Sequence, residues 1–107
     1  MDKIGLVTIT YYSANVLRPF LDCVWKQTHS NLILYVIDNA SADATLPMLG
    51  NEKDNRLHVV KNVKNLGVAK ANNQGIRQAI LDGCDLPIST LNISYAWLTT
   101  TIIMLVC

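Results

Sequence analysis

The chain has 107 residues, half of them apolar, and a formal net charge of +1. This length is enough for one domain with a hydrophobic core, and the near-neutral charge gives no sign of a nucleic-acid-binding face or of an acidic partner. The three cysteines, Cys23, Cys84 and Cys107, show no metal-ligand or redox-pair spacing, which fits a reducing compartment.

The first part of the chain alternates between strand and helix patterns. Residues Ile4–Thr10 are rich in β-branched side chains and predict a strand. Apolar residues at helical spacing then predict a helix through Trp25, capped by Asn15 and with Pro19 in its first turn. The apolar run Leu32–Ile37 predicts a strand that is buried on both faces, as parallel strands are.

The alternation continues beyond this strand. Ser41 or Asp43 can cap a short helix, and Leu57–Val60 predicts a third strand. A longer helix is predicted over Val68–Leu81, and Gly83 supplies its stop. This order predicts an α/β fold, a Rossmann-like three-layer sandwich in which crossover helices cover a mainly parallel sheet.

The end of the chain differs in composition, because the last charged residue is Asp85. The uncharged stretch favours two buried or edge strands. The alternatives are a membrane segment, for which the apolar part is short, and a poorly ordered or self-associating tail. We therefore divide the chain into an α/β domain at 1–85 and an uncharged, β-prone tail at 86–107, which packs on the same domain or pairs with another copy.

Several common α/β sites are excluded by their motifs. The sequence has no G-x-G-x-x-G, no Walker-type phosphate loop and no G-x-S-x-G elbow. No acidic pair ends the first strand, as a receiver-like signalling domain would need. His29 and His58 lack metal partners at ligand spacing, so we expect them to be surface or structural residues.

Three loops remain, and each follows a predicted strand. They contain Thr10–Ser13, Asp38–Asn39 and Asn65–Val68. The carboxyl ends of parallel strands meet at one edge of a sheet, where ligands bind in open α/β folds. A carboxylate such as that of Asp38 can accept a hydrogen bond there from a base N–H or a ribose hydroxyl.

With their flanks, these loops resemble the family 2 glycosyltransferases, which use nucleotide sugars and have the GT-A fold. The matching segments are Val7–Tyr11, Gln27–Thr28, Val36–Thr45 and Asn65–Ile76. The resemblance covers about Ile4 to Asp85. Its Asn72-Asn73-Gln74-Gly75 run is most similar to rhamnosyltransferase-type members.

The resemblance implies a nucleotide-sugar site. Its residues would be Thr10, Tyr11, Asp38, Asn39, Asn65, Gly67 and Asn72. Asp38 would accept the imide N–H of uracil or thymine, so the donor would be of the UDP or dTDP type, or it would cap the next helix. Tyr11 would lie against the base or ribose, or pack under the first loop. Thr10 would hydrogen-bond the nucleotide, or simply end its strand.

The remaining positions have mixed expectations. Gly67 would allow a positive φ or a close approach of the backbone. Asn65 is expected to cap the helix that opens at Val68 rather than to contact the ligand. Asn72 stands where many members carry an arginine, whose charge an amide cannot supply, and Asn73 is expected to brace the loop. Tyr12 departs from the asparagine that usually follows the tyrosine.

In the family, the fourth strand ends in an Asp-x-Asp-like motif that holds Mg²⁺ or Mn²⁺ against the diphosphate. That motif should fall near Leu91–Ser94, which contains no carboxylate. The acceptor half of the fold, which would hold the catalytic base, is also absent. We therefore assign no catalytic residue and no metal ligand, and we expect the uncharged tail to be a shifted reading frame or an otherwise aberrant end.

The sequence thus predicts a glycosyltransferase fragment that binds a nucleoside diphosphate sugar but is inactive alone. The intact enzyme would transfer the sugar, with inversion, to a saccharide or lipid-linked acceptor during cell-surface polysaccharide synthesis. We expect no nucleic-acid partner and a location in the cytoplasm or at the inner face of the membrane. The alternative is a non-catalytic nucleotide-binding or self-associating α/β module, with a homodimer formed through the tail strands.

Overall fold

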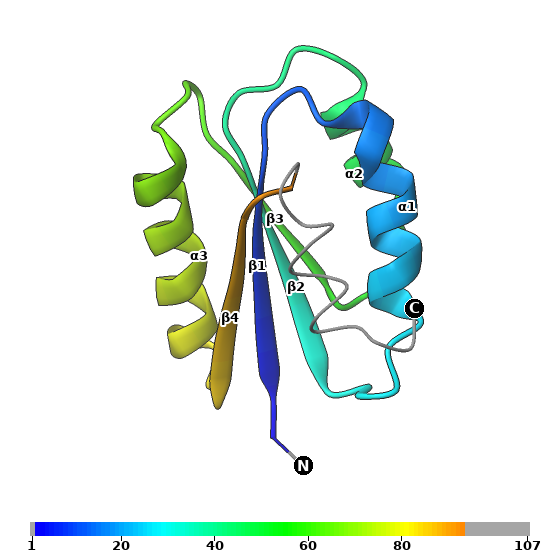
Figure 1. The fold of residues 1–107 in the computed structure, drawn as a ribbon. Helices are drawn as coiled ribbons and strands as arrows, with labels where there is room; N and C mark the ends of the chain where they lie inside the picture. Colours follow the sequence, from blue (N-terminus) through cyan, green and yellow to red (C-terminus); the bar gives the residue numbers. More distant parts are fainter. Residues whose placement is uncertain (1, 94–107) are drawn as a thin grey trace.

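The computed structural model describes residues 2–93 as a four-stranded sheet with helices on both faces (Figure 1). In chain order the elements are β1 (Ile4–Thr10), α1 (Ala14–Trp25), β2 (Leu32–Asp38), α2 (Thr45–Asn51), β3 (Leu57–Lys61), α3 (Val68–Leu81) and β4 (Leu86–Asn92). The predicted alternation of strands and helices is confirmed, and the bounds of β1 and α3 are those that the sequence predicts.

The four strands are parallel and lie in the order β3-β2-β1-β4. Thr10 of β1 lies opposite Asp38 of β2, and Asp38 lies opposite Lys61 of β3. The strands therefore end level with one another. We call this side of the sheet the carboxyl edge and the opposite side, where Ile4 and Leu86 are paired, the amino edge.

Two apolar cores make the structure a three-layer sandwich. The core between the sheet and α1 and α2 contains Leu6, Leu17, Phe20, Leu21, Val24, Leu32, Leu34, Val36, Leu49 and Ile93. The core under α3 contains Val7, Ile9, Tyr35, Ile37, Ala71 and Ala79. Because β1 and β2 supply alternate residues to both cores, they are buried on both faces, as the sequence predicts for β2.

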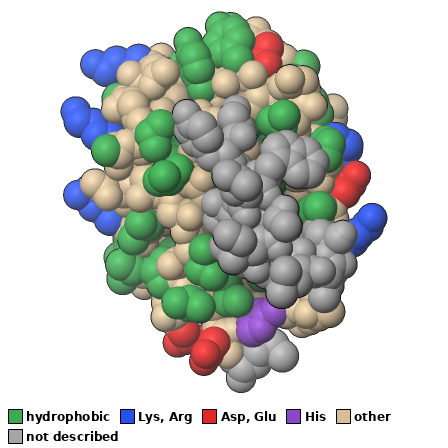
Figure 2. Space-filling view, viewed as in Figure 1, with side chains coloured by type: hydrophobic (Ala, Val, Ile, Leu, Met, Phe, Trp, Pro, Cys, Tyr) green, Lys and Arg blue, Asp and Glu red, His purple; other side chains and the backbone are tan. Residues whose placement is uncertain are grey.

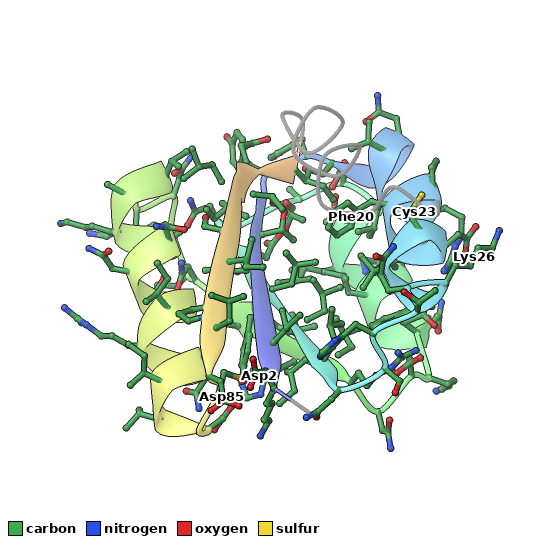
Figure 3. All side chains as sticks on the ribbon, turned by 60° about the horizontal axis from the view of Figure 1, so that its bottom comes forward. Asp2, Phe20, Cys23, Lys26 and Asp85 are labelled. Carbon is green, nitrogen blue, oxygen red and sulfur yellow. The ribbon has the colours of Figure 1, made fainter. Side chains whose placement is uncertain are left out.

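Phe20 and Lys26 show how α1 is oriented (Figure 3). Phe20 is 6% exposed and belongs to the core against the sheet, whereas Lys26 lies just past the helix end and is exposed. The same view marks the amino edge by Asp2 and Asp85, both of which are exposed. Asp85 accepts a hydrogen bond from the backbone N–H of Lys3 at 2.8 Å.

Helix α3 approaches β1 closely at two glycines. A Cβ atom at Gly75 would lie 2.3 Å from Cγ1 of Val7, and one at Gly5 would lie 2.8 Å from Cβ of Ala79. Real Cβ atoms do not approach other atoms this closely, so a larger residue at either position would force the helix away from the sheet. The two glycines thus set the distance between α3 and β1 along most of the helix.

The predicted start of α1 is wrong. The helix begins at Ala14, so Asn15 lies inside it and Pro19 is its sixth residue, beyond the first turn. The neighbouring loop supplies the acceptors instead: the backbone N–H groups of Ser13 and Ala14 donate to Thr45 Oγ1 at 2.9 Å and to Asp43 Oδ2 at 3.4 Å. A cap from another segment leaves no local sequence signal.

Asp43, one of the two predicted caps of α2, is placed at the start of that helix. Its Oδ1 accepts the backbone N–H of Thr45 at 3.0 Å and the hydroxyl of the same residue at 2.6 Å. The hydroxyl contact is the main reason why the pKa of Asp43 lies below its ordinary value. Ser41, the other candidate, bonds to Asp38 instead.

One strand of the predicted tail is described. It is β4, which forms an end of the described sheet beside β1. The second predicted strand, the membrane segment and the self-associating tail concern residues 94–107, which lie outside the described residues. Within residues 2–93, no helix is long and apolar enough to cross a membrane.

Candidate functional site

Among the described residues, left-handed backbone conformations gather at the carboxyl edge, apart from Gly83 (φ 78°) after α3. Positive φ values occur at Tyr12 (51°) after β1, at Ala40 (67°) after β2, at Gly67 (83°) before α3 and at Leu91 (59°) near the end of β4. For residues other than glycine this conformation costs about 1–2 kcal/mol each. Such strain is found at ligand sites, so this edge is the first candidate for function.

Asp38 joins the ends of the first two strands. Its side chain is fully buried, and Oδ1 accepts the hydroxyls of Thr10 at 2.6 Å and Ser41 at 2.7 Å, while Oδ2 accepts the backbone N–H of Ser41 at 2.8 Å. Because a carboxylate offers roughly four acceptor positions, one remains on Oδ2. Asp38 does not cap α2, which begins at Thr45. The contact with a base stays a prediction.

Thr10 also has a role that the sequence analysis did not consider. It is fully buried, and its hydroxyl donates to Asp38. Thr10 is therefore part of the support beneath the carboxyl edge. Its expected hydrogen bond to a nucleotide stays a prediction.

The loop after β1 presents two tyrosines to solvent. Tyr11 is 45% exposed and Tyr12 is 50% exposed, and their rings meet edge to face with centroids 4.7 Å apart. The backbone N–H of Tyr12 donates to Ser41 Oγ at 2.9 Å, which fastens this loop to the one after β2. The alternative in which Tyr11 packs under the loop is wrong, and the exposed ring is available for stacking.

Asn39 connects the end of β2 to the loop after β3. It is 2% exposed, and its Oδ1 accepts Nδ2 of Asn62 at 2.9 Å and the backbone N–H of Leu66 at 3.5 Å. Its own Nδ2 donates to the carbonyl oxygen of Gly67 at 3.3 Å. The ligand contact expected of Asn39 stays a prediction.

Sequence reasoning missed Asn62 and Gln74. Nδ2 of Asn62 donates to Oε1 of Gln74 at 2.8 Å, and Nε2 of Gln74 donates back to Oδ1 of Asn62 at 2.9 Å. The only signal in the sequence is one amide at the start of the predicted loop and another inside the predicted helix, and this gives no distance. The expected brace, Asn73, is instead exposed on α3.

The predicted cap at Asn65 is wrong. Helix α3 begins at Val68 with Gly67 before it, so Asn65 lies two residues too early. Its Oδ1 accepts the backbone N–H of Gly67 at 2.8 Å and closes a turn inside the loop. The positive φ expected at Gly67 is confirmed.

Asn72 connects α3 to β4, because its Oδ1 accepts the hydroxyl of Ser89. That hydroxyl oxygen also accepts the backbone N–H of Leu91 at 3.0 Å. The register between β1 and β4 shifts here, from Val7 opposite Ser89 to Ile9 opposite Asn92. The end of β4 thus contains a bulge held by uncharged side chains.

The described residues at this edge do not fit a magnesium or manganese ion. Hard divalent cations need several carboxylate or carbonyl oxygens, yet β4 ends with Leu91 and Asn92, and Ile93 follows. The nearby carboxylates of Asp38 and Asp43 already accept hydrogen bonds from protein groups. Among residues 2–93, no group of three or more histidines, cysteines and acidic residues is placed to hold a metal.

Basic side chains lie beside the carboxyl edge. Lys61 ends β3, Lys64 lies in the following loop and Lys70 lies in the first turn of α3, and all three are exposed. Lysines and arginines project along the side of the molecule where α3 lies (Figure 2). This side of the molecule is therefore positively charged near the three loops.

Comparison with known proteins identifies the same region. The profile of the family described as Glycosyl transferase family 2 matches residues 6–82, which include all three loops. The glycosyltransferase GlyA of Streptococcus pneumoniae serotype 4 (strain ATCC BAA-334 / TIGR4) is 31% identical over 77 residues, which are 70% of this chain and 11% of GlyA.

Two solved structures are also similar. The mannosyltransferase PcManGT from Pyrobaculum calidifontis, in complex with GDP-Man and Mn²⁺, has a TM-score of 0.66 and 26% identity over 73% of this chain and 24% of its own. S. aureus TarS has a TM-score of 0.71 and 23% identity over 84% of this chain and 16% of its own, and this likeness concerns the fold alone. The chain thus spans a quarter or less of each relative's length.

Proposed function

Because the chain belongs to glycosyl transferase family 2, we propose that residues 1–85 form the donor-binding half of a nucleotide-sugar glycosyltransferase. The observation that carries this proposal is the set of hydrogen bonds from Asp38 and Asn39. These adjacent residues tie the ends of β1 and β2 and the loop before α3 into one edge. A ligand held by three loops needs them in a fixed relation, since preorganisation lowers the entropy cost of binding.

In this proposal Asp38 selects the base. Uracil and thymine each carry an imide N–H, which the remaining acceptor position on Oδ2 of Asp38 would receive, and adenine has no ring N–H to offer. We propose a donor of the UDP or dTDP type. Guanine also has a ring N–H, and PcManGT was solved with GDP-Man, so GDP is the necessary comparison.

Tyr11 and Gly67 would act on the outer side of the site. The exposed ring of Tyr11 would stack on the base or ribose. A Cβ atom at Gly67 would meet no described atom within 4 Å, so the backbone there is open to a close approach by the ligand. Asn65 and Asn72 would hold the loop and helix beside it.

The intact protein would transfer the sugar, with inversion, to a hydroxyl of a saccharide or lipid-linked acceptor. We place this reaction in cell-surface polysaccharide synthesis, in the cytoplasm or at the inner face of the membrane. The described residues offer no set of metal ligands, so we derive no step through a metal ion. The 107-residue chain alone is expected to show no turnover.

One observation favours a second candidate, a self-associating module. Strand β4 forms an end of the described sheet, and its side chains Leu86 and Leu91 are 50% and 47% exposed. Unpaired strand edges with apolar side chains associate readily. Light scattering on the 107-residue chain separates the candidates, since the module predicts a dimer whether or not a nucleotide is present.

The proposal is tested by titrating the chain with UDP, dTDP, GDP and ADP in a calorimeter or by ligand-observed NMR. We expect weak binding of UDP or dTDP, no binding of ADP, and loss of binding in Asp38→Ala. Tyr11→Ala should weaken binding without affecting the fold, because the ring is exposed. The matched control is Asp22→Ala, which removes an exposed carboxylate paired with Arg18 on α1. Equal binding of ADP, or no binding at all, would contradict the proposal.

A further inference from the structure

We propose that Asn62 and Gln74 are positioning residues that lock the loop 62–67 in the conformation that receives the nucleotide. The inference rests on the proposed function, which it deepens by naming the parts that hold one wall of the site. Neither residue is expected to contact the ligand. Each acts through Asn39 and the loop backbone.

The pair joins the start of the loop to the helix that follows it. Asn62 directly follows β3, and Gln74 lies about two turns into α3. Their amides exchange two hydrogen bonds of 2.8 Å and 2.9 Å. The chain between them therefore leaves the sheet and enters the helix at a fixed separation.

The pair continues into the residues beside Asp38. The second N–H of Asn62 Nδ2 donates to Oδ1 of Asn39 at 2.9 Å, and the backbone N–H of Asn62 donates to the carbonyl oxygen of Asp38 at 2.9 Å. Asn39 in turn holds Gly67, the residue with the left-handed backbone, through the carbonyl oxygen of Gly67. A change at Gln74 would thus reach the turn at Gly67 through two side chains.

The network has one hydrogen-bonding arrangement. Asn62 uses both hydrogens of its Nδ2 group and accepts through Oδ1. Rotating that amide by 180° would set N–H against N–H toward Gln74 and oxygen against oxygen toward Asn39. A hydrocarbon or a carboxylate of similar size cannot reproduce this pattern.

The loop itself has little else to hold it. Val63 is 98% exposed, Lys64, Asn65 and Gly67 are exposed, and Leu66 is the one apolar side chain of the loop that is half-buried. Segments with few buried apolar contacts open readily unless hydrogen bonds hold them. Helix α3 does not need the pair for docking, because the contact between Gly75 and Val7 and the core under α3 already fix it. Loop conformation is therefore the property that the pair controls.

The test compares Asn62→Leu and Gln74→Met with the matched control Gln78→Met. Gln78 is on the same helix and donates its amide to Asp82 at 3.1 Å, at the amino edge. The double variant Asn62→Gln with Gln74→Asn moves one methylene across the pair and restores both amides. The two measurements are backbone amide exchange of residues 62–67 by NMR in the ligand-free chain, and the Kd for UDP and dTDP.

We expect loop exchange and Kd to rise about tenfold in Asn62→Leu and Gln74→Met, to stay unchanged in Gln78→Met, and to recover substantially in the double variant. Unchanged loop exchange in Gln74→Met overturns the inference, as does an equal effect of Gln78→Met. If no variant and no parent chain binds a nucleotide, the proposed function fails. In that case the role of Asn62 and Gln74 in holding the loop is overturned as well only if the amide exchange rates of residues 62–67 are unchanged in the variants.

Discussion

The two edges of the sheet are held by different chemistry. At the carboxyl edge, hydroxyls and amides surround the buried Asp38, and the pairs among Asn39, Asn62 and Gln74 contain no titratable group. At the amino edge the bonds run between ionisable groups. The hydroxyl of Tyr35 donates to Oδ2 of Asp82 at 2.6 Å, and this contact is the main reason why the pKa of Asp82 is lowered.

The pKa of Tyr35 is raised, chiefly because burial removes its hydroxyl from water and next because it donates to Asp82. Nζ of Lys3 donates to the carbonyl oxygen of Asp82 at 2.8 Å, which fastens the end of α3 to the start of β1. The comparison teaches that ionisable groups join α3 to the strands at the amino edge, whereas neutral amides shape the loop after β3 at the carboxyl edge, beside the carboxylate of Asp38. The bond between Tyr35 and Asp82 should depend on pH, whereas the amide pairs among Asn39, Asn62 and Gln74 should not.

The largest expected effect on stability comes from the packing of α3 on β1, which lies between the two edges. Gly75→Ala should lower the free energy of unfolding by about 3 kcal/mol, because the added methyl group overlaps Val7. The control is Gly50→Ala, whose methyl group meets no described atom within 4 Å. Urea denaturation measures both. Equal stability of the two variants would show that α3 is not held at the distance described.

Asp38→Ala removes hydrogen bonds at the carboxyl edge and leaves the amino edge unchanged. The change leaves two hydroxyls and the backbone N–H of Ser41 without their acceptor in a buried place, and we expect a loss of about 2 kcal/mol. Asp22→Ala removes an exposed ion pair and should cost no more than about 0.5 kcal/mol. A loss from Asp38→Ala as small as that of the control would mean that the carboxylate does not support the edge.

Tyr35→Phe tests whether the bonds at the two edges differ in their dependence on pH. Because the folded pKa of Asp82 lies below its ordinary value of 3.8, the stabilisation from the Tyr35 bond is present above about pH 4 and is lost as the pH falls through the lowered folded value. The stability difference between Tyr35→Phe and the parent should therefore shrink at low pH. For Gln74→Met, measured over the same range, the difference should stay constant, and a matching decline there would contradict the distinction between the edges.

The smallest effect concerns backbone strain at the carboxyl edge. Ala40→Gly should raise the free energy of unfolding by less than about 1 kcal/mol, since the left-handed conformation costs glycine little. Ala44→Gly is the control, because Ala44 has an ordinary φ of −75° and should lose stability slightly. Thermal unfolding of both variants measures the difference, and a loss in Ala40→Gly would argue against strain at this turn.

Local patterns predicted the architecture well. The β-branched run at Ile4–Thr10 and the helical spacing at Val68–Leu81 led to correct bounds, because each element's own sequence determines its period. The helix caps at Asn15 and Asn65 were predicted wrongly. At the start of α1 the acceptors are Asp43 and Thr45, at the start of α2, and no local pattern reports such a contact.

The sequence predicted where the site lies but not the hydrogen bonds that hold it. Strand ends located Asp38, Asn39 and Gly67 at one edge, since a parallel sheet requires it. The pairing of Asn62 with Gln74 depends on how α3 lies over the sheet, which Gly75 determines through a contact with Val7. A single sequence does not contain that distance.

The bulge in β4 has a consequence for protein engineering. Leu91 is 47% exposed and has a φ of 59°, a conformation that a leucine adopts at a cost and that aspartate and asparagine adopt more readily. Backbone and side chain are therefore poorly matched at this position. Leu91→Asp would relieve the mismatch and place a carboxylate at the strand end, which makes it the natural first step in building a cation site into this scaffold.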